Sequence, residues 1–265
     1  MTATPAAERW ADGLAAWAIP PAILDAAPES PWGFPAALFA ASAREAMLIE
    51  SPSRTRAAEA LRPDGSVLDV GAGVGAASLR LAPPAGRLTA VDASADMLAA
   101  FAALADELGV AHDEVLGAWP AVHDAVAVAD VCVCHHVAYN VGDLHGFAMA
   151  LTDRARRRVV VELTATHPQS SLNGFWRHFH QFERPEHPTA DDAIAVLVEA
   201  GLEVGVERWT SPAFNANAER DVVVAFARRR LCLPVDREPE IDALLDDSAI
   251  MEPRSMVTLW WDGAG

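Results

Sequence analysis

The sequence predicts an α/β fold in which a doubly wound, mainly parallel sheet of seven strands carries a helical cap at its N-terminus. From Ser66 onwards, short apolar runs alternate with stretches of helical periodicity. Regular alternation of this kind is typical of parallel sheets with right-handed crossovers. The 265 residues suffice for one such domain and a cap, but they are short for two independent domains.

The first part of the chain is expected to form several short helices. It is rich in alanine, and Trp10, Leu14 and Trp17 recur at helical spacing. Prolines divide this region, because proline lacks a backbone donor and interrupts helices. The best helix is expected over 36–50, and another begins with Pro52 in its first turn.

The later elements follow from apolar runs and turn residues. Strands are expected at 67–70, 88–92, 113–116, 127–136, 159–163, 202–209 and 221–227. Helices are expected near 74–82, 95–108, 144–155, 189–201 and 238–246. The last two strands are expected to pair as a hairpin or as an addition at the sheet edge. The chain thus divides into an N-terminal helical cap (1–62), a ligand-binding domain (63–230) and a C-terminal extension (231–265).

Charge and cysteine content narrow the classes of function. Acidic residues outnumber basic ones by 37 to 20, which gives a net charge of −17. Such a surface repels phosphate backbones and disfavours a nucleic-acid substrate. The three cysteines, Cys132, Cys134 and Cys232, are too few for a disulfide framework. Because the sequence shows no signal peptide and no apolar run of membrane-spanning length, we expect a cytoplasmic protein without a membrane partner.

The most informative segment is VLDVGAGVGAASL at 67–79, where a strand leads into a glycine-rich bend and then a helix. Glycines let the backbone turn tightly and approach a ligand with no Cβ in the way. The following helix would offer free N–H groups. Gly71, Gly73 and Ala76 also satisfy the G-x-G-x-x-G/A dinucleotide fingerprint, so the bend alone does not distinguish between cofactors.

An acidic residue at the end of the second strand narrows the choice of cofactor. Asp92 follows Gly71 by about 20 residues, where a carboxylate can accept hydrogen bonds from both ribose hydroxyls of an adenosine. It belongs to the segment LTAVDASADML at 88–98. Together with VLDVGAGVGAASL, this segment resembles motifs I and II of the class I, Rossmann-like, S-adenosylmethionine (SAM)-dependent methyltransferases.

The resemblance implies that 63–230 is a methyltransferase domain and that SAM is its cofactor. In this family the glycine bend lies under the methionine part of the cofactor, and the acid after the second strand holds the ribose. Asp69 matches the acid that orders the bend near the cofactor's ammonium group. The expected cofactor contacts are Asp69, Gly71, Ala72, Gly73, Gly75, Asp92, Ala93, Met97, Ala118, Trp119 and His135.

The segment after the third strand departs from the family pattern. The family usually has a Gly-Asp-Ala-like stretch whose acid reaches the adenine amino group, whereas this chain has Gly117-Ala118-Trp119-Pro120. Backbone groups of Ala118 can still contact the adenine edge, and Trp119 can pack against the ring. The alternative for Trp119 is ordinary packing at the edge of the fold.

The loop after the fourth strand carries the catalytic candidates, which are His135, His136 and Tyr139, with Asn140 next to them. Ligands of doubly wound sheets bind beyond the carboxyl ends of the strands, and the resemblance places this loop beside the reactive methyl group. Histidine serves as a general base near neutral pH. The alternative is that one histidine bonds to backbone and the other caps the strand. We favour His136 as the residue that acts on substrate.

An irregular stretch at 162–185 concentrates polar and aromatic groups, and loops in this position commonly form part of the substrate wall in the family. Its candidate wall residues are Glu162, Thr164, His167, Trp176, His178 and His180. No Cys/His spacing typical of a metal site is present. Three N-terminal aromatic residues, Trp32, Phe34 and Phe39, are candidate lid contacts, with plain core packing as the alternative.

We therefore expect the protein to transfer a methyl group from SAM to an oxygen or nitrogen atom of a small molecule. A homodimer is one oligomeric state that the sequence allows. A protein or RNA methyltransferase is the first alternative. The acidic charge and the absence of an N-P-P-[YF]-like tetrapeptide after the fourth strand argue against the nucleic-acid version. A non-catalytic SAM-binding module is the second, and the missing adenine acid favours it. An NAD(P)-dependent oxidoreductase is the third.

Overall fold

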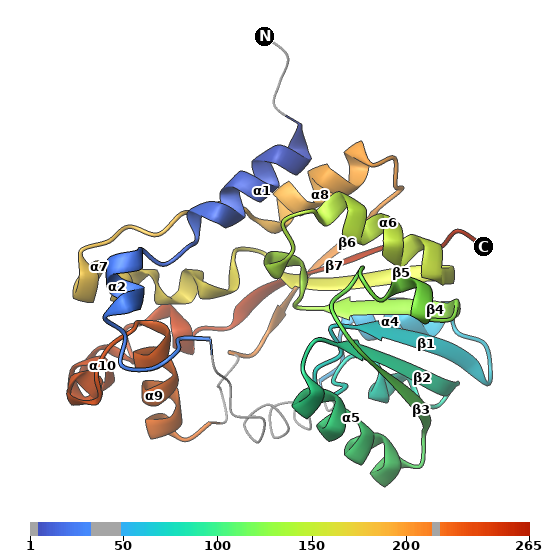
Figure 1. Cartoon of the computed structure of the whole chain (residues 1–265), viewed down its shortest axis with the longest axis horizontal. Coiled ribbons are helices and arrows are strands. Elements are labelled where there is room, and N and C mark those ends of the chain that lie inside the picture. Colours follow the sequence, from blue (N-terminus) through green and yellow to red (C-terminus); the bar gives the residue numbers. More distant parts are fainter. Residues whose placement is uncertain (1–4, 33–48, 214–217) are drawn as a thin grey trace.

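The computed structural model describes residues 5–32, 49–213 and 218–265, and its centre is a seven-stranded sheet (Figure 1). The strand order is β3-β2-β1-β4-β5-β7-β6. The strands β1 to β5 run parallel, and β7 is antiparallel to both of its neighbours. The expected mainly parallel, seven-stranded α/β fold is confirmed. The strands are β1 (Gly65–Val70), β2 (Ala85–Asp92), β3 (Ala111–Leu116), β4 (Ala129–His135), β5 (Ala155–Thr164), β6 (Gly205–Ser211) and β7 (Arg254–Asp262).

Helices cover both faces of the sheet because neighbouring residues of each strand point to opposite sides. Leu68 packs with α1, α6 and α8, while the adjacent Val67 packs with α4 and α5. In Figure 1, α1, α6 and α8 lie above the sheet, and α5 lies below it. These helices are α1 (Ala6–Ala16), α4 (Pro52–Ala60), α5 (Ala95–Leu108), α6 (Leu144–Arg154) and α8 (Ala190–Glu199).

A second group of helices stands beside the sheet and has its own apolar cluster. It contains Trp176, Val223, Leu231 and Ile241, all of them almost fully buried. Figure 1 shows the four helices gathered at one end of the molecule. They are α2 (Pro21–Asp25), α7 (Asn173–His180), α9 (Arg220–Arg230) and α10 (Glu238–Leu244).

The strand expected at 221–227 was wrong, because these residues lie within the helix α9. A short run of valines fits either a strand or a buried helical face. Here Val223 and Ala227 lie four residues apart and are buried together in the helical cluster. The seventh strand is β7, which lies between β5 and β6. It belongs to the segment that the sequence assigned to a C-terminal extension, so that segment contributes a strand to the sheet.

The helix expected near 74–82 is also absent. The glycine bend continues through turns into the short 3₁₀ segment Leu79–Leu81. Gly73 and Gly75 have φ angles of 53° and 89°, which a right-handed helix does not accept. Pro83 follows directly and disfavours helical backbone at Ala82. The bend therefore offers turn amides rather than the first turn of an α-helix.

Some expectations fall outside the described residues, among them nearly all of the helix at 36–50 and the aromatic residues Phe34 and Phe39. The three cysteines are buried and free. No helix in the described part of the chain is long and apolar enough to cross a membrane.

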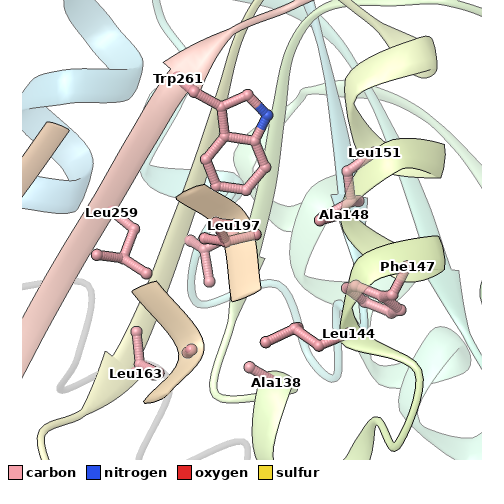
Figure 2. Close-up of a pocket in the computed structure, with 11 residues that line it drawn as sticks. Ala138, Leu144, Phe147, Ala148, Leu151, Leu163, Leu197, Leu259 and Trp261 are labelled. Atoms are coloured by element: carbon pink, nitrogen blue, oxygen red, sulfur yellow. The ribbon is translucent and has the colours of Figure 1, made fainter. Parts of the chain in front are cut away.

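A small cavity of about 10 Å³ lies on the upper face of the sheet, under α6 and α8 (Figure 2). It has room for about one water molecule. Every lining residue is apolar, including Phe147, Leu197 and Trp261. Because it contains no polar group that could orient a ligand, this space is a packing gap in the core.

Candidate active site

The glycine bend leaves β1 at its carboxyl end and is tied to the neighbouring strand. The amides of Gly71 and Ala72 donate to the Val91 carbonyl, at 2.8 and 3.1 Å. A Cβ on Gly71 would lie 2.3 Å from Val137 Cγ2. At Gly73 a Cβ would meet nothing within 4 Å. The bend therefore touches the loop after β4 on one side and faces open space at Gly73.

Asp92 joins the bend to the start of α5. Its Oδ2 accepts a hydrogen bond from the Gly73 amide at 2.8 Å, and its Oδ1 accepts one from the Ser94 amide at 2.9 Å. Ser94 in turn caps α5 by accepting from the Met97 amide at 3.3 Å. The carboxylate therefore holds the bend and the beginning of α5 at a fixed separation. Ala93 is exposed beside it, and Met97 is half-buried.

Asp69 is fully buried beneath the bend. Neither of its carboxylate oxygens has a hydrogen-bond partner of normal geometry among the described residues. Burial raises the pKa of Asp69 to about 7, and it outweighs the opposing effect of the neighbouring Ser78. An ionised carboxylate is costly to bury without a cation, so a cationic ligand group next to Asp69 would favour its ionised form.

The segment after β3 continues the same edge. The Gly117 amide donates to the Asp92 carbonyl at 2.9 Å, which brings Ala118 and Trp119 beside the ribose-binding acid predicted from the sequence. Ala118 is exposed. The Trp119 ring lies 5.5 Å from the His123 ring, centroid to centroid. Its Nε1 is buried and has no hydrogen-bond partner in the described chain.

The two histidines after β4 meet a carboxylate from β5. His135 pairs in register with Glu162 across the two strands. The Glu162 Oε1 lies 3.3 Å from His136 Nε2 and 3.9 Å from His135 Nδ1. Burial lowers the pKa of His135, so this imidazole is neutral near pH 7. The His136 side chain is 43% exposed, so it is the one open to a ligand.

Glu162 is itself nearly buried and remains ionised. Burial by itself would raise its pKa, but the two imidazoles and the Ser53 hydroxyl outweigh burial and lower the pKa to about 2. Arg80 and Arg254 also lie close enough for their charges to interact with it. Sequence reasoning placed Glu162 only in a substrate wall. It missed the three supporting residues, because they come from α4, the turn after the bend and β7.

Tyr139 lies at the same edge, but its hydroxyl is engaged. It donates to the Thr164 carbonyl at 2.9 Å. Its ring lies 5.5 Å from the stacked Trp10 ring of α1 and 5.2 Å from the His167 ring. His167 stacks at 3.8 Å on Trp17, and burial lowers the pKa of His167 to about 3. These rings join the N-terminal helix to the sheet.

The remaining wall candidates belong to the helical group. Trp176 is fully buried there. The Nε2 of His178 lies 2.8 Å from a carboxylate oxygen of Glu240, and the Nε2 of His180 lies 2.7 Å from the Leu231 carbonyl. One ring nitrogen of each histidine is thus occupied by a contact with α10 or with the end of α9.

Comparison with known proteins relates the chain to methyltransferases. Residues 67–158, less than half of the chain, match a family model described as a methyltransferase domain. No curated protein sequence matches the chain. The YcgJ protein from Bacillus subtilis has a similar structure, with a TM-score of 0.54 and 18% identity over 80% of this chain and 98% of that one.

Two solved methyltransferases are also similar. One is magnesium protoporphyrin IX methyltransferase from Synechocystis with bound SAH, at a TM-score of 0.52 and 12% identity over 86% of this chain and 84% of that one. The other is geranyl diphosphate methyltransferase in complex with GPP and sinefungin, at a TM-score of 0.50 and 14% identity over 81% and 79%. Likeness at these identities concerns the fold.

Residues 67–158 thus match a methyltransferase domain, and the chain has the Rossmann-like fold of the similar methyltransferases, a family whose cofactor is SAM. The residues of the bend fit that cofactor. Asp69 is a buried carboxylate without a cation, which suits the cofactor's ammonium group. Gly73 leaves open space where a ligand can approach the backbone.

Proposed function

We propose that this methyltransferase transfers the methyl group of SAM to an oxygen or nitrogen atom of a small-molecule acceptor, at the edge formed by the bend and the loop after β4. The observation that carries the proposal is the position of His136. The loop that holds it touches the bend through Val137 and Gly71, and its imidazole is the open member of the histidine pair.

The cofactor contacts proposed for this chain follow the bend and the next two strand ends. SAM supplies an electrophilic methyl group, so the chain has mainly to align the acceptor and exclude water. Alignment of this kind can contribute roughly 7–11 kcal/mol in favourable cases. The proposed contacts are Asp69, Gly71, Ala72, Gly73, Gly75, Asp92, Ala93, Met97, Ala118, Trp119 and His135.

Charge and similarity support a small acceptor. A net charge of −17 disfavours a polyanionic substrate. Two structurally similar proteins are methyltransferases named after small molecules, magnesium protoporphyrin IX and geranyl diphosphate. The catalytic candidates are His135 and His136, with His136 nearer to solvent. The oxygen of Tyr139, the third candidate, already donates its proton to the Thr164 carbonyl.

The cofactor site is tested by calorimetry with SAM on wild type, Asp92→Ala and Asp96→Ala. Asp92 holds the Gly73 amide, whereas Asp96 lies in the first turn of α5 without a described role at the bend. We expect Asp92→Ala to weaken SAM binding by at least about tenfold, because a charged hydrogen-bond acceptor contributes about 1.5–3 kcal/mol. Asp96→Ala should bind SAM as wild type does.

The acceptor class is tested with radiolabelled SAM and a panel of small phenols, alcohols, carboxylates and amines, alongside RNA and a protein extract. Label in small molecules alone is the expected outcome. Label in RNA or protein alone would contradict the small-molecule proposal. SAM binding with no transfer to any acceptor would indicate a non-catalytic SAM-binding module instead.

A further inference from the structure

Glu162 is a buried carboxylate at an edge where a neutral side chain would be less costly to bury. Its side chain is 9% exposed, and it nevertheless stays ionised. Desolvating a carboxylate costs several kcal/mol unless cations and donors surround it. The groups that face it are His135 and His136 from β4, Ser53 from α4, Arg80 after the bend and Arg254 from β7.

The hydroxyl groups of Ser53 and Thr258, together with the indole of Trp209, form a hydrogen-bonded line that ends at this carboxylate. The Trp209 Nε1 donates to the Thr258 hydroxyl at 3.1 Å. The Thr258 and Ser53 hydroxyl oxygens lie 2.7 Å apart. Thr258 pairs with Glu162 across β5 and β7. If Trp209 donates to Thr258, Thr258 donates to Ser53 and Ser53 donates to Glu162, every hydrogen bond in the line runs towards the carboxylate. This arrangement favours one orientation of the carboxylate.

His136 is held in an unusual backbone conformation. Its φ angle of 61° lies in the left-handed region, which is strained for a residue other than glycine. Two contacts with one residue compensate. Its amide donates to the Glu162 carbonyl at 2.8 Å, and its Nε2 lies 3.3 Å from the Glu162 carboxylate. Because Nε2 faces Glu162, Nδ1 is the nitrogen that remains for a ligand.

We propose that Glu162 is the positioning residue of a His136–Glu162 pair in which His136 acts as general base, and that the acceptor is therefore a neutral hydroxyl compound such as a phenol or alcohol. This inference rests on the proposed function and narrows its acceptor class. An amine in its free-base form attacks the methyl group without losing a proton first. A hydroxyl group is a poor nucleophile until its proton leaves, so it is the acceptor that needs such a pair.

The proton and electron changes balance without a further reactant. The acceptor O–H bond breaks towards Nδ1 of His136, an O–C bond forms to the methyl group of SAM, and the C–S electron pair remains on sulfur. The resulting imidazolium is stabilised by the Glu162 carboxylate through Nε2, and it returns the proton to solvent. His136 is exposed enough for that return.

The experiment compares two phenols with wild type, His136→Ala and Glu162→Gln, in the presence of saturating SAM. One is unsubstituted phenol, which is protonated at pH 7. The other is 4-nitrophenol, which is assayed at a pH where it is ionised. For phenol, we expect His136→Ala to lower kcat by on the order of 100-fold and Glu162→Gln by at least about tenfold. For ionised 4-nitrophenol, both variants should stay within about threefold of wild type.

The pH dependence gives a second readout. Without a base in the protein, the rate with phenol should rise with pH in His136→Ala, as the acceptor itself ionises. The wild-type rate should depend less on pH over the same range. The titratable and charged groups that face the pair are the His135 imidazole and the guanidinium groups of Arg80 and Arg254. Because these groups are the same in both proteins, the difference between the two pH profiles reports on His136.

The control is Asp130→Asn. Asp130 lies at the start of β4, whereas His135 is the last residue of that strand, so this change removes a carboxylate far from the pair. It should keep the ratio of phenol to 4-nitrophenol rates. If Glu162→Gln does not fold, Ser53→Ala, which shortens the hydroxyl line, takes its place with a smaller expected loss. Variants that lose equal activity on both phenols would overturn the pair, because they would show a purely structural role.

Failure of this inference is separable from failure of the proposed function. Transfer to aniline and other amines, with no transfer to any phenol or alcohol, would overturn the hydroxyl acceptor and leave small-molecule methyl transfer intact. The absence of transfer to every small molecule, with SAM binding retained, would remove the proposed function and the inference together.

Discussion

At the scale of single residues, Asp69 is the buried carboxyl group that we propose to face the ammonium group of SAM. The carboxyl group is buried under the bend with no hydrogen-bond partner of normal geometry among the described residues. Its pKa is raised to about 7. In the free protein it therefore carries a proton for part of the time near neutral pH. A cationic ligand group would favour the ionised form, so SAM binding should release protons.

Asp69 also predicts a change of stability with pH. A folded-state pKa above the ordinary value means that its contribution to stability is complete at low pH and is lost as pH rises to about 7. Asp69→Asn cannot ionise, so it should gain stability relative to wild type, by about 2–4 kcal/mol between pH 4 and pH 7. Urea unfolding of the free protein at several pH values measures this difference.

Asp130 provides a control with the opposite sign. The Ser66 amide and the Arg156 guanidinium lower the pKa of Asp130 despite its partial burial. Its contribution to stability is present at neutral pH and is lost as pH falls through the lowered pKa. Asp130→Asn should therefore be less stable than wild type at pH 7, and the gap should close in acid. Parallel curves for the two variants would contradict both assignments.

At the scale of elements, the bend can contact the loop after β4 because Gly71 has no Cβ atom. Gly71→Ala would drive a Cβ to 2.3 Å from Val137 and impose a φ of 70° on alanine. Gly73→Ala meets open space and suffers only from its φ of 53°. We expect Gly73→Ala to cost about 1 kcal/mol of stability and Gly71→Ala about 1–3 kcal/mol more.

A double variant distinguishes the clash from the backbone strain. Gly71→Ala combined with Val137→Ala removes the blocking methyl group, so thermal or urea unfolding should recover part of the loss. The same Val137→Ala change combined with Gly73→Ala should recover nothing. Equal behaviour of the two pairs would mean that the bend and the loop do not touch as described.

The N-terminal helix α1 is joined to the loop after β4 by the stacking of Trp10 on Tyr139 and by a hydrogen bond from Trp10, and Tyr139 in turn bonds to β5. The Trp10 Nε1 donates to the Val141 carbonyl at 2.7 Å, and the Tyr139 hydroxyl donates to the Thr164 carbonyl at 2.9 Å. Tyr139→Phe keeps the ring and leaves a carbonyl unpaired, so it should lower the free energy of unfolding by about 1–2 kcal/mol. Chemical denaturation checks this value, and no loss would mean that water replaces the phenol.

At the scale of the whole molecule, the C-terminal segment completes the sheet. β7 pairs with β5 along seven positions and with β6 along seven more. Val257, Leu259 and Trp261 are nearly fully buried in the main core. A chain that ends at residue 253 should lose cooperative unfolding and expose apolar surface, because β6 then has no partner strand. Circular dichroism and a melting curve measure this, and a truncated chain that melts like wild type would contradict it.

The glycine bend, the acid after β2 and the histidines after β4 could be found in the sequence because each depends on local chemistry. Positive φ angles favour glycine, and an acid about 20 residues after such a bend stands where dinucleotide-binding folds hold the ribose. The same local rules gave β1 to β5, α5 and α8 close to their observed limits. They were wrong at 221–227, because an apolar run of that length fits a buried helix equally well.

The sequence by itself determined the fold class and predicted both SAM as the cofactor and the edge proposed here as the site, since strand alternation and motif spacing encode these. Tertiary structure decided the partners of Glu162, the place of the last strand and which histidine faces solvent. Ser53 and Thr258 are 205 residues apart in the chain, yet their hydroxyl oxygens lie 2.7 Å apart. No local pattern specifies such a contact, because it forms only when α4 and β7 pack on the same strand.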